Sequence, residues 1–239
     1  MKKILIVNDD GIEADGLLRL AETSRELGEV WIVAPDSQRS AASHSITLHS
    51  HIDVYPYPDY PVKGVHAYSC SGTPADCVRV GSISIMPYKP DIVLSGINYG
   101  YNSATDLQYS ATVGAAMEGA FQGYQAIALS EGFSKVHEVT DTYLKQVIEE
   151  LMDKPLGYGQ IFNVNFPDCP LTECRGILRD RAVSHGMFYR DTYKVMDRLP
   201  DGGIRFMVDG HYNEEAEEGT DLKAIIDRYV SIGIVDNLH

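Results

Sequence analysis

Short, nearly continuous apolar runs recur along the first part of the chain, and segments with helical periodicity separate them. The runs are KKILIV, EVWIVA, DIVLSG, QAIALS and QIFNVNFP, and the last of them ends at Pro167. An apolar run without polar alternation is typical of a strand buried on both faces, as in parallel sheets covered by helices. We therefore predict a doubly wound, mostly parallel sheet between two helical layers, a Rossmann-like three-layer α/β/α fold.

The segments between these runs carry apolar residues at helical spacing. Leu17, Leu20 and Ala21 predict one helix, which we expect Gly28 to end as a C-terminal cap. A Thr-Pro step at 73–74 predicts the start of another helix, with the threonine as its N-cap. Later helical patterns begin at Val113 and Leu144, strands are expected at HIDVYPYP and GVHAYSC, and a polar loop is expected from Ile97 to Tyr109.

The alternation of apolar runs and helical segments ends at about residue 170. RLPDGG followed by RFMVDG predicts a β-hairpin, and an acidic loop then leads to a short helix and a strand. We predict a single domain over residues 1–239, with a core over about 1–170 and an oligomerisation extension over about 171–239. A hairpin that protrudes from such a core cannot bury itself, so we expect it to pack on another subunit.

The charge balance limits the classes of partner. Acidic residues outnumber basic ones by 34 to 20, giving a net charge of -14, and this field repels nucleic acid polymers and anionic membranes. Four cysteines without metal-site spacing, Cys70, Cys77, Cys169 and Cys174, are expected to be reduced packing thiols. The opening MKK leads directly into ILIV without a signal-peptide pattern, so we expect a cytoplasmic protein.

Polar side chains gather after the predicted strands, where ligands bind in an open parallel sheet. Asn8, Asp9 and Asp10 follow the first strand, Asp36 and Ser40 the second, and Asn98 and Asn102 follow DIVLSG, while Ser110 and Thr112 begin the next helix. Two adjacent carboxylates repel each other unless a cation, water or a helix N-terminus stabilises them. Hard oxygen ligands suit Mg²⁺, Mn²⁺ or Ca²⁺, and the helix N-terminus suits a phosphate, so the set indicates phosphoryl chemistry.

Each of these features also has a purely structural interpretation. Asp10 can cap the following helix, Ser40 can be a solvated hydroxyl, and Ser110 and Thr112 can be ordinary N-caps. His49 and His51 are expected on an exposed strand edge, and Asn163 and Asn165 either brace a loop or contact substrate. Three aromatic residues near the predicted site, Tyr99, Tyr101 and Tyr109, are candidates for stacking on a base or for packing a loop.

Several stretches, in order, resemble the SurE family of metal-dependent nucleotidases. They are VNDDG, APDSQRSAASHSIT, GTPADCV, SGINYGYN, YSATVGAAMEG and NVNFP, with TDLKAIIDRYVSI near the end. The resemblance implies one divalent cation, Mg²⁺ or Mn²⁺ with Ca²⁺ a candidate in crystals, held by Asp9, Asp10, Ser40 and Asn98. It also implies hydrolysis of nucleoside 5'-monophosphates, with 3'-nucleotides and short polyphosphate as further substrates. Ser110 and Thr112 match the family's phosphate-side loop, Asn102 lies beside it, and a homodimer or tetramer through the C-terminal extension is expected.

Two positions depart from the family pattern, which has Gly where this chain has Ala41 and Ala111. If either position needs a positive φ, its Cβ costs roughly 1 kcal/mol or more. The expected mechanism activates a water, with Asp9 taking its proton, and the alternative is direct attack by a carboxylate to form an aspartyl-phosphate. The rival functions are a silent nucleotide-binding module and a receiver-like domain, although DIVLSGIN lacks the receiver's acceptor aspartate.

Overall fold

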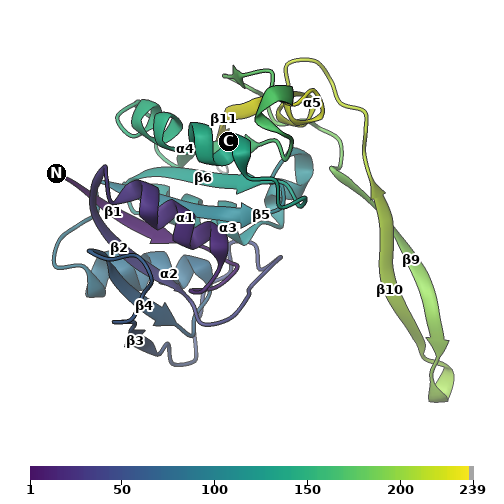
Figure 1. Cartoon of the computed structure of the whole chain (residues 1–239). Helices are drawn as coiled ribbons and strands as arrows, with labels where there is room; N and C mark the ends of the chain where they lie inside the picture. Colours follow the sequence, from purple (N-terminus) through teal and green to yellow (C-terminus); the bar gives the residue numbers. More distant parts are fainter. Residues whose placement is uncertain (237–239) are drawn as a thin grey trace.

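A nine-stranded sheet forms the centre of the computed structural model, which describes residues 1–236 (Figure 1). Its strands are β1 (Lys2–Val7), β2 (Gly28–Pro35), β3 (Val54–Pro56), β4 (His66–Cys70), β5 (Ile92–Tyr99), β6 (Gln125–Glu131), β7 (Gln160–Phe166), β8 (Ile177–Leu178) and β11 (Val230–Asp236). The order across the sheet is β3-β4-β2-β1-β5-β6-β7-β11-β8. All neighbours from β4 to β7 run parallel, while β3 and β11 pair antiparallel with β4 and β7.

Helices cover both faces of this sheet. They are α1 (Asp15–Ser24), α2 (Pro74–Val80), α3 (Ala111–Phe121), α4 (Glu138–Leu151) and α5 (Asp221–Ile226). Ile4 and Ile6 of β1 pack with apolar residues of α1 and α4 in one cluster. Leu5 and Val7, which alternate with them, pack with residues of α2 and α3 in the other. The predicted three-layer, mostly parallel architecture is therefore confirmed.

Two predicted helix boundaries have different outcomes. Thr73 caps α2 as predicted, because its hydroxyl accepts from the Asp76 amide while the Asp76 carboxylate accepts from the Thr73 amide. The predicted cap at Gly28 is wrong, since α1 ends at Ser24 and Gly28 begins β2. Glycine is needed there because a Cβ would lie 2.3 Å from the carbonyl oxygen of Lys2 in the neighbouring strand.

The strand boundaries also differ from the prediction in two places. β5 continues to Tyr99 instead of ending before Ile97, with an irregularity in its pairing to β6 between Ser95 and Asn98. A short 3₁₀ turn, η2 (Ala104–Gln108), then occupies part of the expected loop. β3 begins only at Val54, so His49 and His51 lie in exposed irregular chain instead of on a strand edge.

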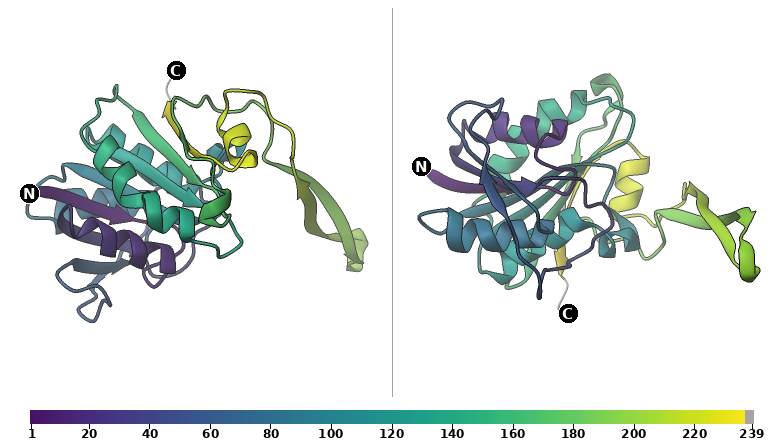
Figure 2. Two further views of the ribbon diagram at one scale, coloured as in Figure 1. Left: turned by 45° about the horizontal axis from the view of Figure 1, so that its top comes forward. Right: turned by 90° about the horizontal axis from the view of Figure 1, so that it is seen from below.

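The chain after β7 divides into a projecting part and a part that returns to the sheet. β9 (Tyr189–Arg198) and β10 (Ile204–Tyr212) form an antiparallel hairpin, confirming the predicted one, and Figures 1 and 2 show it projecting away from the sheet. Below, this hairpin is called the arm. α5 and β11 follow, and β11 inserts between β7 and β8. Among the described residues, we find no helix with the length and apolar character needed to cross a membrane.

Candidate active site

The two adjacent carboxylates lie directly after β1, at the carboxyl end of the sheet. Asn8 fixes this turn, because its side-chain amide donates to the Gly11 carbonyl at 2.8 Å and accepts from the Gly11 amide. Gly11 has φ +106°, a value that L side chains rarely adopt. The N-cap of α1 is Ala14, so Asp10 does not cap that helix. The helix-capping interpretation of Asp10 is therefore excluded.

Asp9 is almost completely buried, with 4 % of its surface exposed. One of its oxygens, Oδ1, accepts a hydrogen bond of 2.6 Å from the Thr112 hydroxyl. Burial, opposed by the bond from Thr112 and helped by the nearby Asp10 carboxylate, raises the pKa of Asp9 to about 6. Burying an ionised carboxylate without a compensating cation is unfavourable. The protein thus holds a carboxylate in surroundings that a positive charge would stabilise.

Asp10 is joined to the loop after β2 by a residue that the sequence did not single out. The Gln38 amide donates to Asp10 Oδ1 at 3.4 Å and to Ser40 Oγ at 2.9 Å. Burial also raises the pKa of Asp10, and hydrogen bonds from the Tyr99 amide and from Gln38 oppose this rise. One donor group therefore bridges two of the predicted metal ligands, which confirms that Asp10 and Ser40 lie close together.

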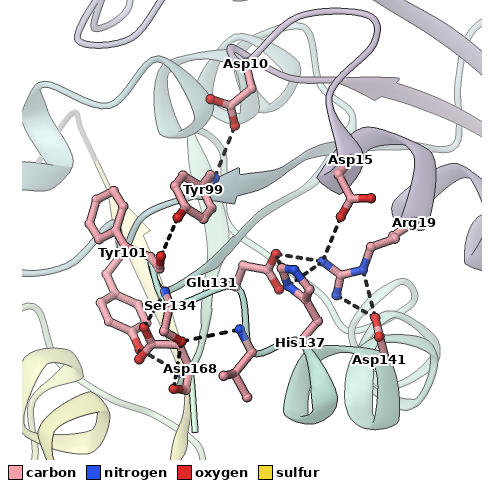
Figure 3. A network of polar contacts seen from close by, with 12 residues as sticks. Asp10, Asp15, Arg19, Tyr99, Tyr101, Glu131, Ser134, His137, Asp141 and Asp168 are labelled. Carbon is pink, nitrogen blue, oxygen red and sulfur yellow. Dashed lines mark hydrogen bonds and ion pairs between the residues drawn. The ribbon is translucent and has the colours of Figure 1, made fainter.

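The end of β5 supplies the third side of the site. The Tyr99 amide donates to Asp10 Oδ2 at 3.1 Å (Figure 3). Asn98, the preceding residue, donates its side-chain amide to the Gly100 carbonyl at 2.8 Å. That bond fixes the side chain of Asn98 and leaves its carbonyl oxygen without a hydrogen bond among residues 1–236. The structure thus brings Asn98 beside the carboxylate pair.

The start of α3 contributes the predicted hydroxyls, in two different ways. Ser110 is the N-cap of α3, and its Oγ accepts from the Val113 amide at 3.1 Å. Thr112 is completely buried, and its hydroxyl donates a hydrogen bond to Asp9. The loop that carries Ser40 packs on this helix, because a Cβ at Gly114 would lie 2.5 Å from the Ser43 carbonyl oxygen. α3 therefore orients both the Asp9 carboxylate and the loop that carries Ser40.

Asn102, a predicted substrate contact, is buried, and its polar groups bind other residues of the chain. Its side-chain amide donates to Ser130 Oγ at 2.8 Å, and its backbone amide donates to Asn165 Oδ1 at 2.9 Å. Asn163 and Asn165 both donate to the Asn102 carbonyl at 2.9 Å. All four side chains are buried. Of the two interpretations of the asparagine pair, the structure supports loop bracing.

The two alanines that depart from the family pattern stand in different backbone conformations. Ala41 has φ +57°, the left-handed region that favours glycine. Ala111 is the first residue of α3 and is completely buried. The strain considered for both positions therefore applies to Ala41 alone.

The donor set at this point suits a hard divalent cation. Asp9, Asp10, Ser40 and Asn98 offer two carboxylates, a hydroxyl and an amide carbonyl, all oxygen ligands. No group of three or more His, Cys, Asp or Glu side chains within residues 1–236 is arranged to hold a metal ion. A cation here would thus depend on two carboxylates and on neutral oxygens, a combination that favours Mg²⁺ or Mn²⁺ over Zn²⁺.

A second polar network lies near the carboxylate pair and was not found from the sequence. Glu131 accepts from Arg19 Nη1 at 2.6 Å and pairs with His137 Nδ1 at 2.9 Å, and Arg19 also pairs with Asp141 (Figure 3). These residues come from α1, β6, α4 and the loop before α4. The contacts of Arg19 with Glu131 and Asp141 join residues more than 100 positions apart, so no local pattern predicts them.

Comparisons with known proteins bear on the whole chain. A family model described as "Survival protein SurE" matches residues 4–187. A 5'-nucleotidase SurE from Erythrobacter litoralis is 39 % identical, the match covering 96 % of this chain and 91 % of that protein. A 5'/3'-nucleotidase SurE from Erwinia tasmaniensis is 37 % identical, with 96 % and 88 % covered.

A solved structure extends the likeness to three dimensions. The crystal structure of a SurE protein from Aquifex aeolicus matches with a TM-score of 0.83 at 32 % sequence identity. The match covers 99 % of this chain and 94 % of that one.

Proposed function

This chain belongs to the SurE family of survival proteins, and on that premise we propose that it is a phosphomonoesterase acting on nucleoside 5'-monophosphates. Release of phosphate and a nucleoside is the reaction, with 3'-nucleotides and short polyphosphate as additional substrates. Relatives named 5'-nucleotidase and 5'/3'-nucleotidase, which align with nearly the whole chain, support this assignment.

The observation that carries the proposal is that oxygen-bearing side chains from the ends of three strands and the start of one helix lie close together. Gln38 links Asp10 to Ser40, Tyr99 links Asp10 to the end of β5, and Thr112 links Asp9 to α3. In a parallel sheet these ends converge on one crevice, where the N-terminus of a helix favours a phosphate.

Asp9, Asp10, Ser40 and Asn98 are the proposed metal ligands. A divalent cation held there would polarise the phosphoryl oxygens and stabilise the charge that develops on them. Ser110 and Thr112 are the proposed phosphate-side residues, since Ser110 caps α3 and Thr112, in its first turn, contacts Asp9. Thr112 holds Asp9 through Oδ1, and Asp9 is the proposed acceptor of the proton from the attacking water.

Attack by a carboxylate of Asp9 on the phosphorus is the alternative route. Hydrolysis in ¹⁸O-labelled water separates the two. A single turnover that puts label into released phosphate and none into Asp9 supports attack by water, whereas label in the Asp9 carboxylate contradicts it.

The experiment that tests the function is phosphate release from a panel of 5'- and 3'-nucleotides, with EDTA, Mg²⁺ or Mn²⁺. We expect turnover that depends on the metal. In Asp9→Asn it should fall by at least about 100-fold, because the substitution removes a negative charge that binds the metal beside the reacting phosphate. Asp59→Asn is the matched control, because Asp59 is an exposed aspartate in the turn between β3 and β4. Nucleotide binding without turnover by the wild-type protein would instead support the silent binding module.

Self-association through the arm is part of the proposal. Phe206 and Val208 of β10 are 53 % and 59 % exposed in a single copy, and such apolar surface favours a protein partner. We expect the wild-type protein to have the mass of a dimer or tetramer in light scattering. The double change Phe206→Asp and Val208→Asp should yield single copies with an unchanged circular dichroism spectrum, and an unaltered mass would contradict the arm's role.

We also assign the enzyme to the cytoplasm. The four cysteines are free thiols, which suits a reducing compartment. Fractionation of cells that express the chain from its own promoter tests this assignment, and recovery in an extracytoplasmic fraction would contradict it.

A further inference from the structure

A cavity of about 410 Å³ opens beside Asp10, on the side of the sheet that α1 covers. Its walls are the first turn of α1, the ends of β5 and β6, and the loop that follows β6. Pockets of this size hold small organic ligands, typically with a few fixed polar groups on the wall. Because Asp10 lines both this cavity and the candidate metal site, a molecule in the cavity would reach the reacting phosphate.

Glu131 is the unusual group on the cavity wall. The residue is 3 % exposed, and its Oε1 is occupied by Arg19 and His137. Its other oxygen, Oε2, is buried and has no hydrogen-bond partner within residues 1–236. Leaving a buried carboxylate oxygen unpaired is costly, and such groups in native proteins require an explanation. A donor supplied by a bound ligand provides one.

The ion pairs behind Glu131 fix its position. Arg19 contacts Glu131 at 2.6 Å and Asp141 at 2.5 Å, so the guanidinium lies between α4 and the end of β6 (Figure 3). Oε1 accepts from Arg19 and lies 2.9 Å from His137 Nδ1, so Oε2 is the oxygen of Glu131 that has no partner within residues 1–236. Arg19 is therefore a positioning residue for Glu131.

The rest of the wall supplies donors and an aromatic face. Ala14, the N-cap of α1, provides no side-chain cap, and the Asp15 and Gly16 amides make no hydrogen bond within residues 1–236. Tyr99 is 42 % exposed, and the Phe133 ring packs against its ring edge to face with 5.3 Å between the centroids. These groups suit a ligand with a flat ring and several hydroxyl or carbonyl groups.

The charges on the wall exclude the phosphate itself. Asp10, Asp15 and Glu131 line the cavity, and Lys135 is the only lysine or arginine among its lining residues. An excess of negative charge repels an anion and favours a neutral group that donates hydrogen bonds.

We propose that this cavity is the nucleoside subsite and that Glu131 Oε2 accepts a hydrogen bond from a ribose hydroxyl. This inference rests on the proposed nucleotidase function. A carboxylate near the end of a parallel strand recognises ribose in the same chemical way in dinucleotide-binding folds. The enzyme then distinguishes ribonucleotides from 2'-deoxyribonucleotides, and Glu131 is the residue that determines the difference.

The test compares kcat/KM for AMP and 2'-dAMP, and the affinities of adenosine and 2'-deoxyadenosine by calorimetry. Wild-type protein should prefer the ribo form by about tenfold or more, as a hydrogen bond to a charged acceptor allows. In Glu131→Gln the preference should fall toward one, mainly through KM. Glu22→Gln is the matched control, since it makes the same change in an exposed glutamate of α1 that pairs with Arg25 outside the cavity wall, and it should keep the preference.

The possible failures are distinct. Turnover of AMP and 2'-dAMP at equal rates by the wild type, or an unchanged preference in Glu131→Gln, overturns the assignment of Glu131 and leaves the nucleotidase intact. An equal loss of preference in Glu22→Gln also overturns it, because the effect would then not depend on Glu131 Oε2. Preferential binding of adenosine without any phosphate release supports the subsite and contradicts the proposed reaction.

Discussion

The sheet and the arm use similar apolar residues in opposite surroundings. Ile6 of β1 lies between β2 and β5 and is completely buried, whereas Ile204 of β10 is 42 % exposed. Both strands pair along their length, β1 with β2 and β5 on its two sides and β10 with β9 on one side. The difference shows that backbone pairing alone does not bury side chains, because burial also needs a second layer. The sheet has two helical layers, whereas no second layer covers the apolar residues of the arm within residues 1–236.

The largest expected effect on stability appears when an isoleucine is replaced by alanine in the sheet and, for comparison, in the arm. Ile6→Ala should lower the free energy of unfolding by about 2–5 kcal/mol, through lost burial and the cavity left behind. Ile204→Ala should lower it by less than about 0.5 kcal/mol, as for most exposed positions. Urea unfolding at a dilution that yields single copies measures both. Equal losses at that dilution would show that the arm is already packed within one chain.

A middle-sized effect is expected at Asp76, which ties the loop after β2 to α2. Its carboxylate accepts from the Thr47 amide, the Thr47 hydroxyl at 2.6 Å and the Thr73 amide. Asp76→Ala should lower the free energy of unfolding by about 1–3 kcal/mol, because α2 loses part of its cap and the donors of Thr47 and Thr73 are left unpaired. Asp197→Ala on the arm is the control and should leave the unfolding midpoint unchanged.

The same carboxylate predicts a pH dependence. Burial raises the pKa of Asp76, but the hydrogen bonds from Thr47 and Thr73 outweigh it, so that the pKa lies below its ordinary value. The stabilisation is therefore complete above the unfolded pKa of about 4 and is lost as the pH falls through the folded pKa. Urea unfolding from pH 6 to pH 3 should show a steeper loss for the wild type than for Asp76→Ala. Parallel curves would contradict this assignment.

The smallest effects concern two residues with positive φ, one in each region. Ala41→Gly should raise the free energy of unfolding by up to about 1 kcal/mol, because a Cβ at φ +57° is strained. Asp201 in the turn of the arm has φ +60°, a conformation that aspartate tolerates, so Asp201→Gly should change it by only a few tenths. Ala111→Gly, within α3, should lower it by about 1 kcal/mol. Thermal melts check all three, and a stabilised Ala111→Gly would contradict the helical assignment.

The sequence predicted the parts of the fold that local patterns encode. The strands from β1 to β7 that are buried on both faces appear as apolar runs, and Thr73 appears as a cap, because both depend on near neighbours. The insertion of β11 between β7 and β8 depends on pairing with distant chain, so the sequence indicated a final strand without its place.

The site shows the same division between local and distant information. The order of strands placed Asp9, Asp10, Ser40 and Asn98 at one edge, since the carboxyl ends of parallel strands meet there. The direction of a side chain at a helix start depends on tertiary packing, so the engagement of Thr112 with Asp9 was not predicted. Gln38 and Glu131 lack a motif and act through contacts with distant segments.

The position of β11 has a consequence for the synthesis of the protein. β7 pairs with β6 on one side and with β11 on the other, and β11 comes from residues 230–236. While the chain emerges from the ribosome, β7 therefore presents an open, aggregation-prone edge until the arm and α5 have been translated. β11 covers this edge only once residues 230–236 have been made, so a nascent chain that stalls before residue 230 leaves β7 exposed to aggregation.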